Sequence, residues 1–180
     1  MYDMFFGIDP GTTNAAYALY NGFCTFAFDY KEKNLYKYIE QFMHTVLNII
    51  DDYNASLVVI ERQFDKSKEK KLEQFVSIIR YELSVNDIHY MLIAPTQLKL
   101  YLTGSGSADE STYWTAYQKA CDKKEIHGDK FTPVHDSYNQ HVKEAQLLGM
   151  IGYAKHNLDN KLKDDYPKYI KELLNRLVVQ

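Results

Sequence analysis

Three apolar runs separated by short turns open the chain and constrain its fold more than any other feature. Residues 4–9 end in an acid and are followed by Pro10-Gly11. Residues 13–20 end at the hairpin signal Asn21-Gly22, and a third run covers residues 23–30. Apolar runs bounded by such turn residues predict strands joined by tight turns. We therefore expect the chain to begin with a three-strand antiparallel meander.

Helical and strand patterns alternate after this meander. The spacing of apolar residues predicts helices over residues 35–50 (with Asn34 as N-cap), 68–83, 96–102 (with Thr96 as a candidate cap), 112–123, 137–156 and 166–178. Further strands are predicted over residues 57–61 and 89–94, and irregular loops over residues 103–111 and 124–135. This order predicts an α/β fold with a mixed five-stranded sheet flanked by helices. It is the order of the RNase H-like fold.

The composition excludes several classes of protein. The chain has 180 residues and a net charge of −3, which suits one globular domain without a general coat of positive charge. Cys24 and Cys121 have neither zinc-site nor disulfide-scaffold spacing. No apolar run approaches the roughly 20 residues of a membrane span, and the first residues lack the basic region of a signal peptide. We expect a cytoplasmic protein with no membrane partner.

Two acids stand at the ends of the two most apolar predicted strands. Asp9 follows Phe-Phe-Gly-Ile, and Glu61 follows Leu-Val-Val-Ile. A carboxylate at the end of a buried run is costly unless a partner offsets its charge, and a divalent metal is the usual partner. The alternative is that each acid marks the point where a strand leaves the core, or pairs with Arg62. Two acids at matching strand ends favour a site.

A third group of titratable residues lies at the start of the long predicted helix. It contains His135, Asp136, His141 and Glu144, and the last two share one helix face because they are three residues apart. The alternative is that both are polar residues on the surface of an amphipathic helix. Together with Asp9 and Glu61, the group predicts a metal site built from two strand-end acids and two helix ligands.

The turn after the first strand supports a second interpretation. Residues 7–14 include an Asp-x-Gly-Thr-Thr loop like the phosphate-binding loops of sugar kinases, actins and heat-shock chaperones. Those folds need two such domains and about twice this length. We therefore expect no nucleotide cofactor.

Three segments resemble the motifs of the RuvC-type Holliday junction resolvases. They are Gly-Ile-Asp-Pro-Gly-Thr-Thr-Asn from Gly7, Val-Ile-Glu-Arg-Gln-Phe around Glu61, and His-Val-Lys-Glu-Ala from His141. The triplet Glu61-Arg62-Gln63 is closer to the poxviral, phage and yeast mitochondrial members. The resemblance covers residues 1–156, which it identifies as an RNase H-like nuclease domain. We expect residues 157–180 to form a helical extension packed on the same domain.

The third motif departs from the pattern of the family. His141 stands where the family usually has an acid, and Glu144 replaces Asp. Some bacterial members also carry His at the first position, so a neutral imidazole ligand is consistent with the resemblance. Asp136 is the alternative acid if the helix begins in another register.

The resemblance implies hydrolysis of four-way DNA junctions with two Mg²⁺ ions held by Asp9, Glu61, His141 and Glu144, and with Mn²⁺ as a substitute. It implies roles in DNA recombination and repair. The alternatives are an RNase H-fold nuclease that acts on other branched DNA or RNA–DNA hybrid, and a non-catalytic protein that binds junctions.

The resemblance and the clustering of charge also indicate a DNA-binding surface. Its candidate residues are Arg62, Gln63, Phe64, Lys66, Lys68, Lys70, Lys71 and Ser105. Phe64 is either a base-stacking residue or part of the core. Ser105 stands in a Gly-Ser loop where the family usually has Lys, so that Lys99 and the lysines of residues 119–124 are candidates to replace the missing cation.

The family also implies a homodimer through the helix that follows Glu61. Phe75, Ile79 and Leu83 are candidates for that interface, although the same apolar face must cover the sheet. The composition, rich in Tyr, Lys and Asn, is compatible with a phage or a low-GC bacterium. We expect the bacterial cytoplasm as its location.

Overall fold

A computed structural model describes residues 4–12, 14–20, 24–30, 33–62 and 70–180 of the chain. Five strands form one sheet in the order β3-β2-β1-β4-β5. They are β1 (Met4–Asp9), β2 (Ala15–Tyr20), β3 (Cys24–Tyr30), β4 (Ala55–Glu61) and β5 (Tyr90–Ile93). The sheet is mixed: β1 pairs antiparallel with β2 and parallel with β4, and β5 pairs parallel with β4. The first three strands form the antiparallel meander expected from the sequence.

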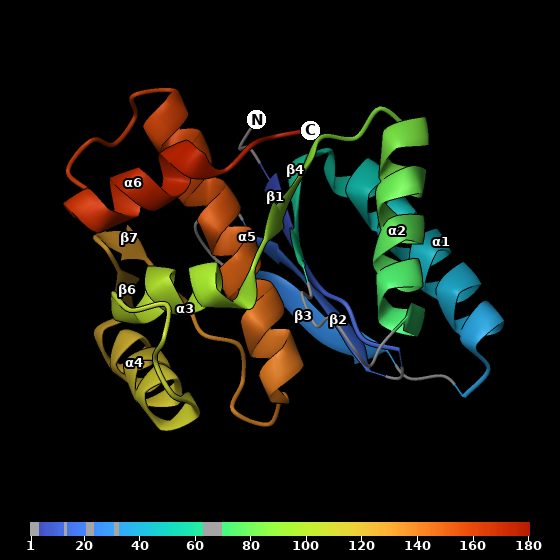
Figure 1. The fold of residues 1–180 in the computed structure, drawn as a ribbon, viewed down its shortest axis with the longest axis horizontal. Coiled ribbons are helices and arrows are strands. Elements are labelled where there is room, and N and C mark those ends of the chain that lie inside the picture. Colours follow the sequence, from blue (N-terminus) through green and yellow to red (C-terminus); the bar gives the residue numbers. More distant parts are fainter. Residues whose placement is uncertain (1–3, 13, 21–23, 31–32, 63–69) are drawn as a thin grey trace.

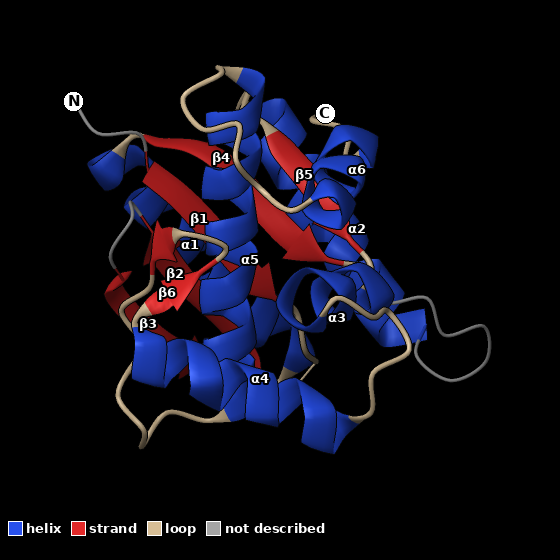
Figure 2. Ribbon diagram, turned by 90° about the vertical axis from the view of Figure 1, so that its left-hand side faces the viewer, coloured by secondary structure: helices blue, strands red, loops and turns tan. Residues whose placement is uncertain are grey.

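Helices cover both faces of this sheet (Figure 1). One face carries α1 (Leu35–Tyr53) and α2 (Lys70–Val85). The other carries α5 (Gln140–Asp159), and the outer helices are α3 (Pro95–Thr103), α4 (Glu110–Lys123) and α6 (Lys168–Arg176). Figure 2 shows α5 crossing in front of the strands, between the sheet and the outer helices. The mixed α/β architecture predicted from the sequence is confirmed.

Strand residues alternate between the two hydrophobic clusters. Phe5 and Val59 pack with α5, whereas Phe6, Ile8 and Ile60 pack with α1 and α2. Successive side chains of a strand point to opposite faces, so both central strands are apolar throughout. The alternation fixes which face each residue at the strand ends must occupy.

The packing of α5 against β1 depends on residues without bulky side chains. A Cβ atom built at Gly7 would overlap the carbonyl oxygen of Ala145 and would lie 2.6 Å from the backbone nitrogen of Gly149. A Cβ at Gly152 would meet side-chain atoms of Val59 and Phe5 instead. The strand and helix backbones are therefore almost in contact, and this contact sets the position of the first turns of α5.

Several boundaries differ from the sequence prediction. The cap of α3 is Ala94 and not Thr96: Pro95 occupies the first turn, where its missing N–H costs nothing, and the Gln97 side chain accepts a hydrogen bond from the Ala94 N–H at 2.8 Å. The long helix begins at Gln140, three residues later than expected, and its cap is Asn139. Asn34 caps α1 as predicted.

The segment predicted as an irregular loop contains a hairpin, β6 (Glu125–Ile126) paired with β7 (Asp129–Lys130). Its two turn residues, His127 and Gly128, both have positive φ, which is the conformation of a two-residue hairpin turn. The usual sequence signals of such a turn are Asn-Gly, Asp-Gly and Gly-Gly, so His-Gly does not mark a hairpin in the sequence.

The C-terminal residues pack against the cluster around α5 and against β5. Ile170, Leu173 and Leu174 of α6 are buried in the cluster formed around α5. Beyond α6, Gln180 exchanges two backbone hydrogen bonds with Tyr90, at 2.8 and 3.1 Å, and covers part of the exposed edge of β5. Among the residues placed in the structure, no helix has the length and apolar character needed to cross a membrane.

Candidate active site

Asp9 and Glu61 lie at the ends of neighbouring parallel strands. The register pairs Ile8 with Ile60, so the two acids occupy equivalent positions on β1 and β4. Because Ile8 and Ile60 pack towards α1 and α2, alternation turns both acids to the face covered by α5. Both residues are buried, with 3% and 6% of their surface exposed. The two acids therefore lie on one face of the sheet, at the ends of neighbouring strands.

His141 and Glu144 approach from the first two turns of α5. The side chain of Asn139 accepts a hydrogen bond from the Val142 N–H at 3.1 Å and fixes the start of the helix. His141 and Glu144 are three residues apart, so they lie on one face of this helix. The close contact between Gly7 and α5 holds that face against the end of β1.

The three residues Asp9, His141 and Glu144 form a compact cluster. Each offers one ligand atom, and these atoms all lie within 4.8 Å of one another. The Nδ1 atom of His141 is 2.7 Å from Oδ2 of Asp9, and the His141 side chain is 37% exposed. One side of the cluster is therefore open to solvent, whereas Asp9 is buried and Glu144 is half-buried.

The pKa of the Glu144 carboxyl is raised to about 8. Burial contributes most, and the neighbouring Asp9 and Glu110 carboxylates add to the rise, whereas His141 opposes it. The raised pKa means that the ionised form of Glu144 is disfavoured, first because it is desolvated and then because other carboxylates lie near it. A divalent cation would favour the ionised form.

Glu61 joins the cluster through a shared pocket. A pocket of about 250 Å³ is lined by Glu61, Glu144, Lys99, Glu110, Tyr113 and Trp114, among others. Glu61 is not one of the three residues whose ligand atoms lie within 4.8 Å of one another. It faces the same space as Glu144, on the side towards α3 and α4.

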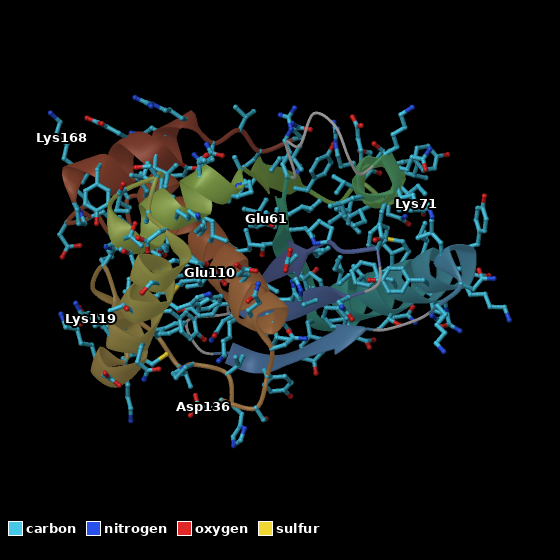
Figure 3. All side chains as sticks on the ribbon, turned by 60° about the horizontal axis from the view of Figure 1, so that its bottom comes forward. Glu61, Lys71, Glu110, Lys119, Asp136 and Lys168 are labelled. Carbon is cyan, nitrogen blue, oxygen red and sulfur yellow. The ribbon has the colours of Figure 1, made fainter. Side chains whose placement is uncertain are left out.

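The structure places the other candidate residues differently. Asp136 is exposed, and Figure 3 shows it at the lower edge of the view, away from Glu61. It is not among the residues of the cluster. The helix begins at Gln140, after Asp136, so the register that would have used Asp136 as a ligand is not the one observed.

The candidate DNA-binding residues are spread over several surfaces. Lys70 and Lys71 line a groove between α1 and α2, across the sheet from α5. Arg62 is exposed directly after Glu61, and Ser105 is exposed in the loop between α3 and α4. The remaining candidates, Gln63, Phe64, Lys66 and Lys68, lie outside the described residues.

Three ionisable residues of the pocket were not assigned to the site from the sequence. Glu110 and Tyr113 come from α4, and Lys99 of α3, which the sequence singled out only as a replacement cation, donates a hydrogen bond to the Ala108 carbonyl at 2.9 Å. The periodicity of α4 indicates a buried face that contains Tyr113, but it does not show what that face covers. Only the tertiary packing of α3 and α4 brings these side chains to the pocket.

The donor set of the cluster fits a divalent metal. Two carboxylate oxygens and one imidazole nitrogen suit Mg²⁺ or Mn²⁺, whose ligand distances of about 2.1 Å allow ligand atoms up to about 4.2 Å apart. The ligand atoms of the cluster lie within 4.8 Å of one another, so the side chains would have to move only slightly towards one another to bind the same ion. The hydrogen bond between His141 and Asp9 would have to yield to such an ion.

Comparisons with solved structures identify the fold. Thermus thermophilus RuvC matches with a TM-score of 0.63 and 18% sequence identity, covering 86% of this chain and 96% of that protein. The same RuvC in complex with a Holliday junction substrate matches with a TM-score of 0.62 and 17% identity, covering 82% and 91%. The fowlpox virus Holliday junction resolvase matches with a TM-score of 0.53 and 15% identity, covering 85% and 99%. The fold of this chain is that of RuvC.

Comparison at the level of sequence gives the family. No curated protein matches the sequence. A family model described as poxvirus A22 protein matches residues 3–99, which is more than half of the chain and includes Asp9 and Glu61. This protein therefore belongs to the poxvirus A22 protein family.

Proposed function

We propose that this protein is a metal-dependent endonuclease that resolves four-way DNA junctions. The observation that carries the proposal is the meeting of Asp9, His141 and Glu144, with Glu61 facing the same pocket, at the carboxyl ends of β1 and β4. The motif resemblance supports it, as do the fold shared with RuvC and the fowlpox virus resolvase and the membership of the poxvirus A22 family.

The four residues Asp9, Glu61, His141 and Glu144 would hold two Mg²⁺ ions, with Mn²⁺ as a substitute. Such a pair of ions activates a water molecule and stabilises the leaving oxygen in phosphodiester hydrolysis. The carboxylates supply the oxygen ligands, and Glu144 must lose its proton to serve as one. The His141 imidazole must be neutral to contribute a nitrogen ligand. No Ser or Cys nucleophile is required.

DNA would approach the open side of the cluster, where His141 is exposed. Arg62 follows Glu61 directly and is exposed, which suits a contact with a phosphate. Lys99 lines the pocket. Its positive charge would replace that of the Lys which the family usually has at the position of Ser105. Lys70 and Lys71 lie on the other helix layer, so they would contact a different arm of the junction or the partner subunit.

We further propose that the protein acts as a homodimer through α1 and α2. Phe75, Ile79 and Leu83 are buried against the sheet, so they do not supply the interface expected from the sequence. A groove of about 740 Å³ between these helices includes Ile39 and Ile78, and Tyr36 beside it is 85% exposed. An exposed apolar surface of this kind is typical of a protein interface.

The proposal is tested by cleavage of labelled substrates in Mg²⁺ and in Mn²⁺. The panel contains a four-way junction, a replication fork, a flap, an RNA–DNA hybrid and a linear duplex. We expect the junction to be cut fastest. Faster cutting of the fork, flap or hybrid would assign another branched or hybrid substrate, and metal-independent binding without cleavage would assign a non-catalytic role. The bacterial or phage setting expected from the composition stays a prediction, since the family is named for poxviruses.

A further inference from the structure

Trp114, the only tryptophan of the chain, lines the pocket of the candidate active site. It lies on α4 and is half-buried, whereas Tyr113 and Tyr117 on the same helix are only 3% and 4% exposed. Part of the indole therefore remains accessible, while the two tyrosines belong to the core. A large aromatic side chain that is partly accessible beside a catalytic pocket is suited to contact a substrate.

Two edge-on contacts hold the indole ring in place. Its centroid lies 4.9 Å from that of Tyr113, with the planes inclined by 78°, and 5.6 Å from that of Tyr117, with the planes inclined by 72°. Neither tyrosine ring lies flat against the indole. The contacts fix its orientation before binding, and a side chain that is already fixed loses little conformational entropy when a ligand stacks on it.

The pocket combines apolar surface with the acids of the candidate metal site. Its volume is about 250 Å³; Trp114, Pro95 and Leu98 supply apolar groups, and Glu61 and Glu144 supply carboxylates. A nucleotide has the matching parts, because metal ions at the carboxylates bind its phosphate and an aromatic side chain stacks on its base. One sugar joins each base to its phosphate, so a phosphate held at these acids brings a base to the wall that carries Trp114.

We propose that Trp114 stacks on the base of a nucleotide next to the scissile phosphate of the bound junction. The inference rests on the proposed function, because it names the part of the DNA that this site contacts. Bases within a linear duplex are paired and stacked on their neighbours, whereas unpaired bases leave the stack at a lower cost. Trp114 therefore favours branched over linear DNA, and it does so for any base, since every base has a π-face.

The first test compares Trp114→Leu with Tyr153→Leu. Both are built on Asp9→Asn, so that the DNA stays intact in Mg²⁺. Tyr153 is a matched control because it is also half-buried, makes edge-on contacts with Phe5 and Tyr20, and lines a different pocket. We expect Trp114→Leu to weaken junction binding by about 10-fold and to leave duplex binding unchanged. Trp114→Tyr should restore most of the affinity, and Tyr153→Leu should change neither affinity.

An abasic nucleotide in the junction locates the contact. Placed in turn on each side of the cleaved phosphate, it removes one base and keeps the backbone. We expect one of these positions to weaken binding by about 10-fold when Trp114 is present and to have no effect on Trp114→Leu, because partners in contact are not additive. Equal losses with and without the indole at every position would show that no base there contacts Trp114.

The fluorescence of Trp114 reports the contact without changing the residue, because the chain has no other tryptophan. Stacking on a base quenches indole emission, so we expect the junction, but not the linear duplex, to quench it in Asp9→Asn. Unchanged emission in a protein that has bound the junction overturns the inference, even if Trp114→Leu does not fold. A purely structural Trp114 would lower the melting temperature of Trp114→Leu without this quenching.

The outcomes separate this inference from the proposed function. If wild type cleaves the junction and Trp114→Leu binds and cleaves it equally well, the stacking role is wrong and the nuclease function stands. If wild type cleaves no branched DNA although the junction quenches the indole, the nuclease function fails and the stacking role stands. Absence of binding to every DNA in the panel overturns both.

Discussion

Replacing Gly7 by Ala tests how the contact between β1 and α5 positions the site. The added Cβ would overlap the carbonyl oxygen of Ala145 and lie 2.6 Å from the backbone nitrogen of Gly149. These are backbone atoms of the helix that carries His141 and Glu144, so α5 must move as a body, by about 1 Å to restore van der Waals contact. Overpacking of this kind costs about 1–3 kcal/mol or more in the free energy of unfolding.

The movement has a larger consequence for function than for stability. A shift of about 1 Å between reacting or ligating groups can cost about 100-fold in rate. We therefore expect Gly7→Ala to remain folded, to lose stability in urea unfolding, and to weaken Mn²⁺ binding and junction cleavage by about 100-fold.

Gly152→Ala is the matched control for this change. It lies on the same interface, but its Cβ would meet side-chain atoms of Val59 and Phe5, which can adjust. We expect a smaller loss of stability and wild-type Mn²⁺ binding. If Gly7→Ala binds Mn²⁺ as tightly as wild type, the contact does not set the geometry of the site and the reasoning is refuted.

Two further predictions concern α5. First, the folded protein holds the Glu144 proton with a pKa of about 8, above the usual value of 4.5, so the contribution of Glu144 to stability is greatest at low pH and falls as pH rises from about 5 to 8. Relative to Glu144→Gln, urea unfolding of the metal-free protein should show a decline of up to about 5 kcal/mol across this window; parallel profiles would contradict it. Second, Asn139→Ala should cost about 1 kcal/mol and fray the turn that carries His141. Asn34→Ala removes the same kind of cap from α1. Mn²⁺ titration should show weaker binding only for Asn139→Ala, and equal effects would argue against this role of the cap.

The sequence predicts the order of strands and helices well, for a physical reason. Strand runs and helix periodicity are local signals, and they gave the order of elements. Asp9 and Glu61 were expected to converge because each ends a buried run, and parallel neighbours bring such ends to one edge of the sheet.

The pocket residues on α3 and α4 could not be predicted from the sequence in the same way. Tyr113 and Lys99 reach the pocket only because α3 and α4 pack outside α5, which depends on long-range contacts with no local signature. Conversely, Lys70 and Lys71 follow Glu61 closely in sequence, yet they line a groove in the other helix layer. Nearness along the chain was a poor guide to nearness in space at this point.

Single-turnover cleavage of a labelled four-way junction by Asp9→Asn tests the central claim most directly. Loss of an outer partner of a metal ligand already costs about 10- to 100-fold, so we expect loss of this ligand to reduce the rate by at least about 100-fold. Asp136→Asn changes an exposed acid outside the cluster in the same way and should cleave like wild type. Undiminished cleavage by Asp9→Asn, or an equal loss in both variants, would contradict an active site at the ends of β1 and β4.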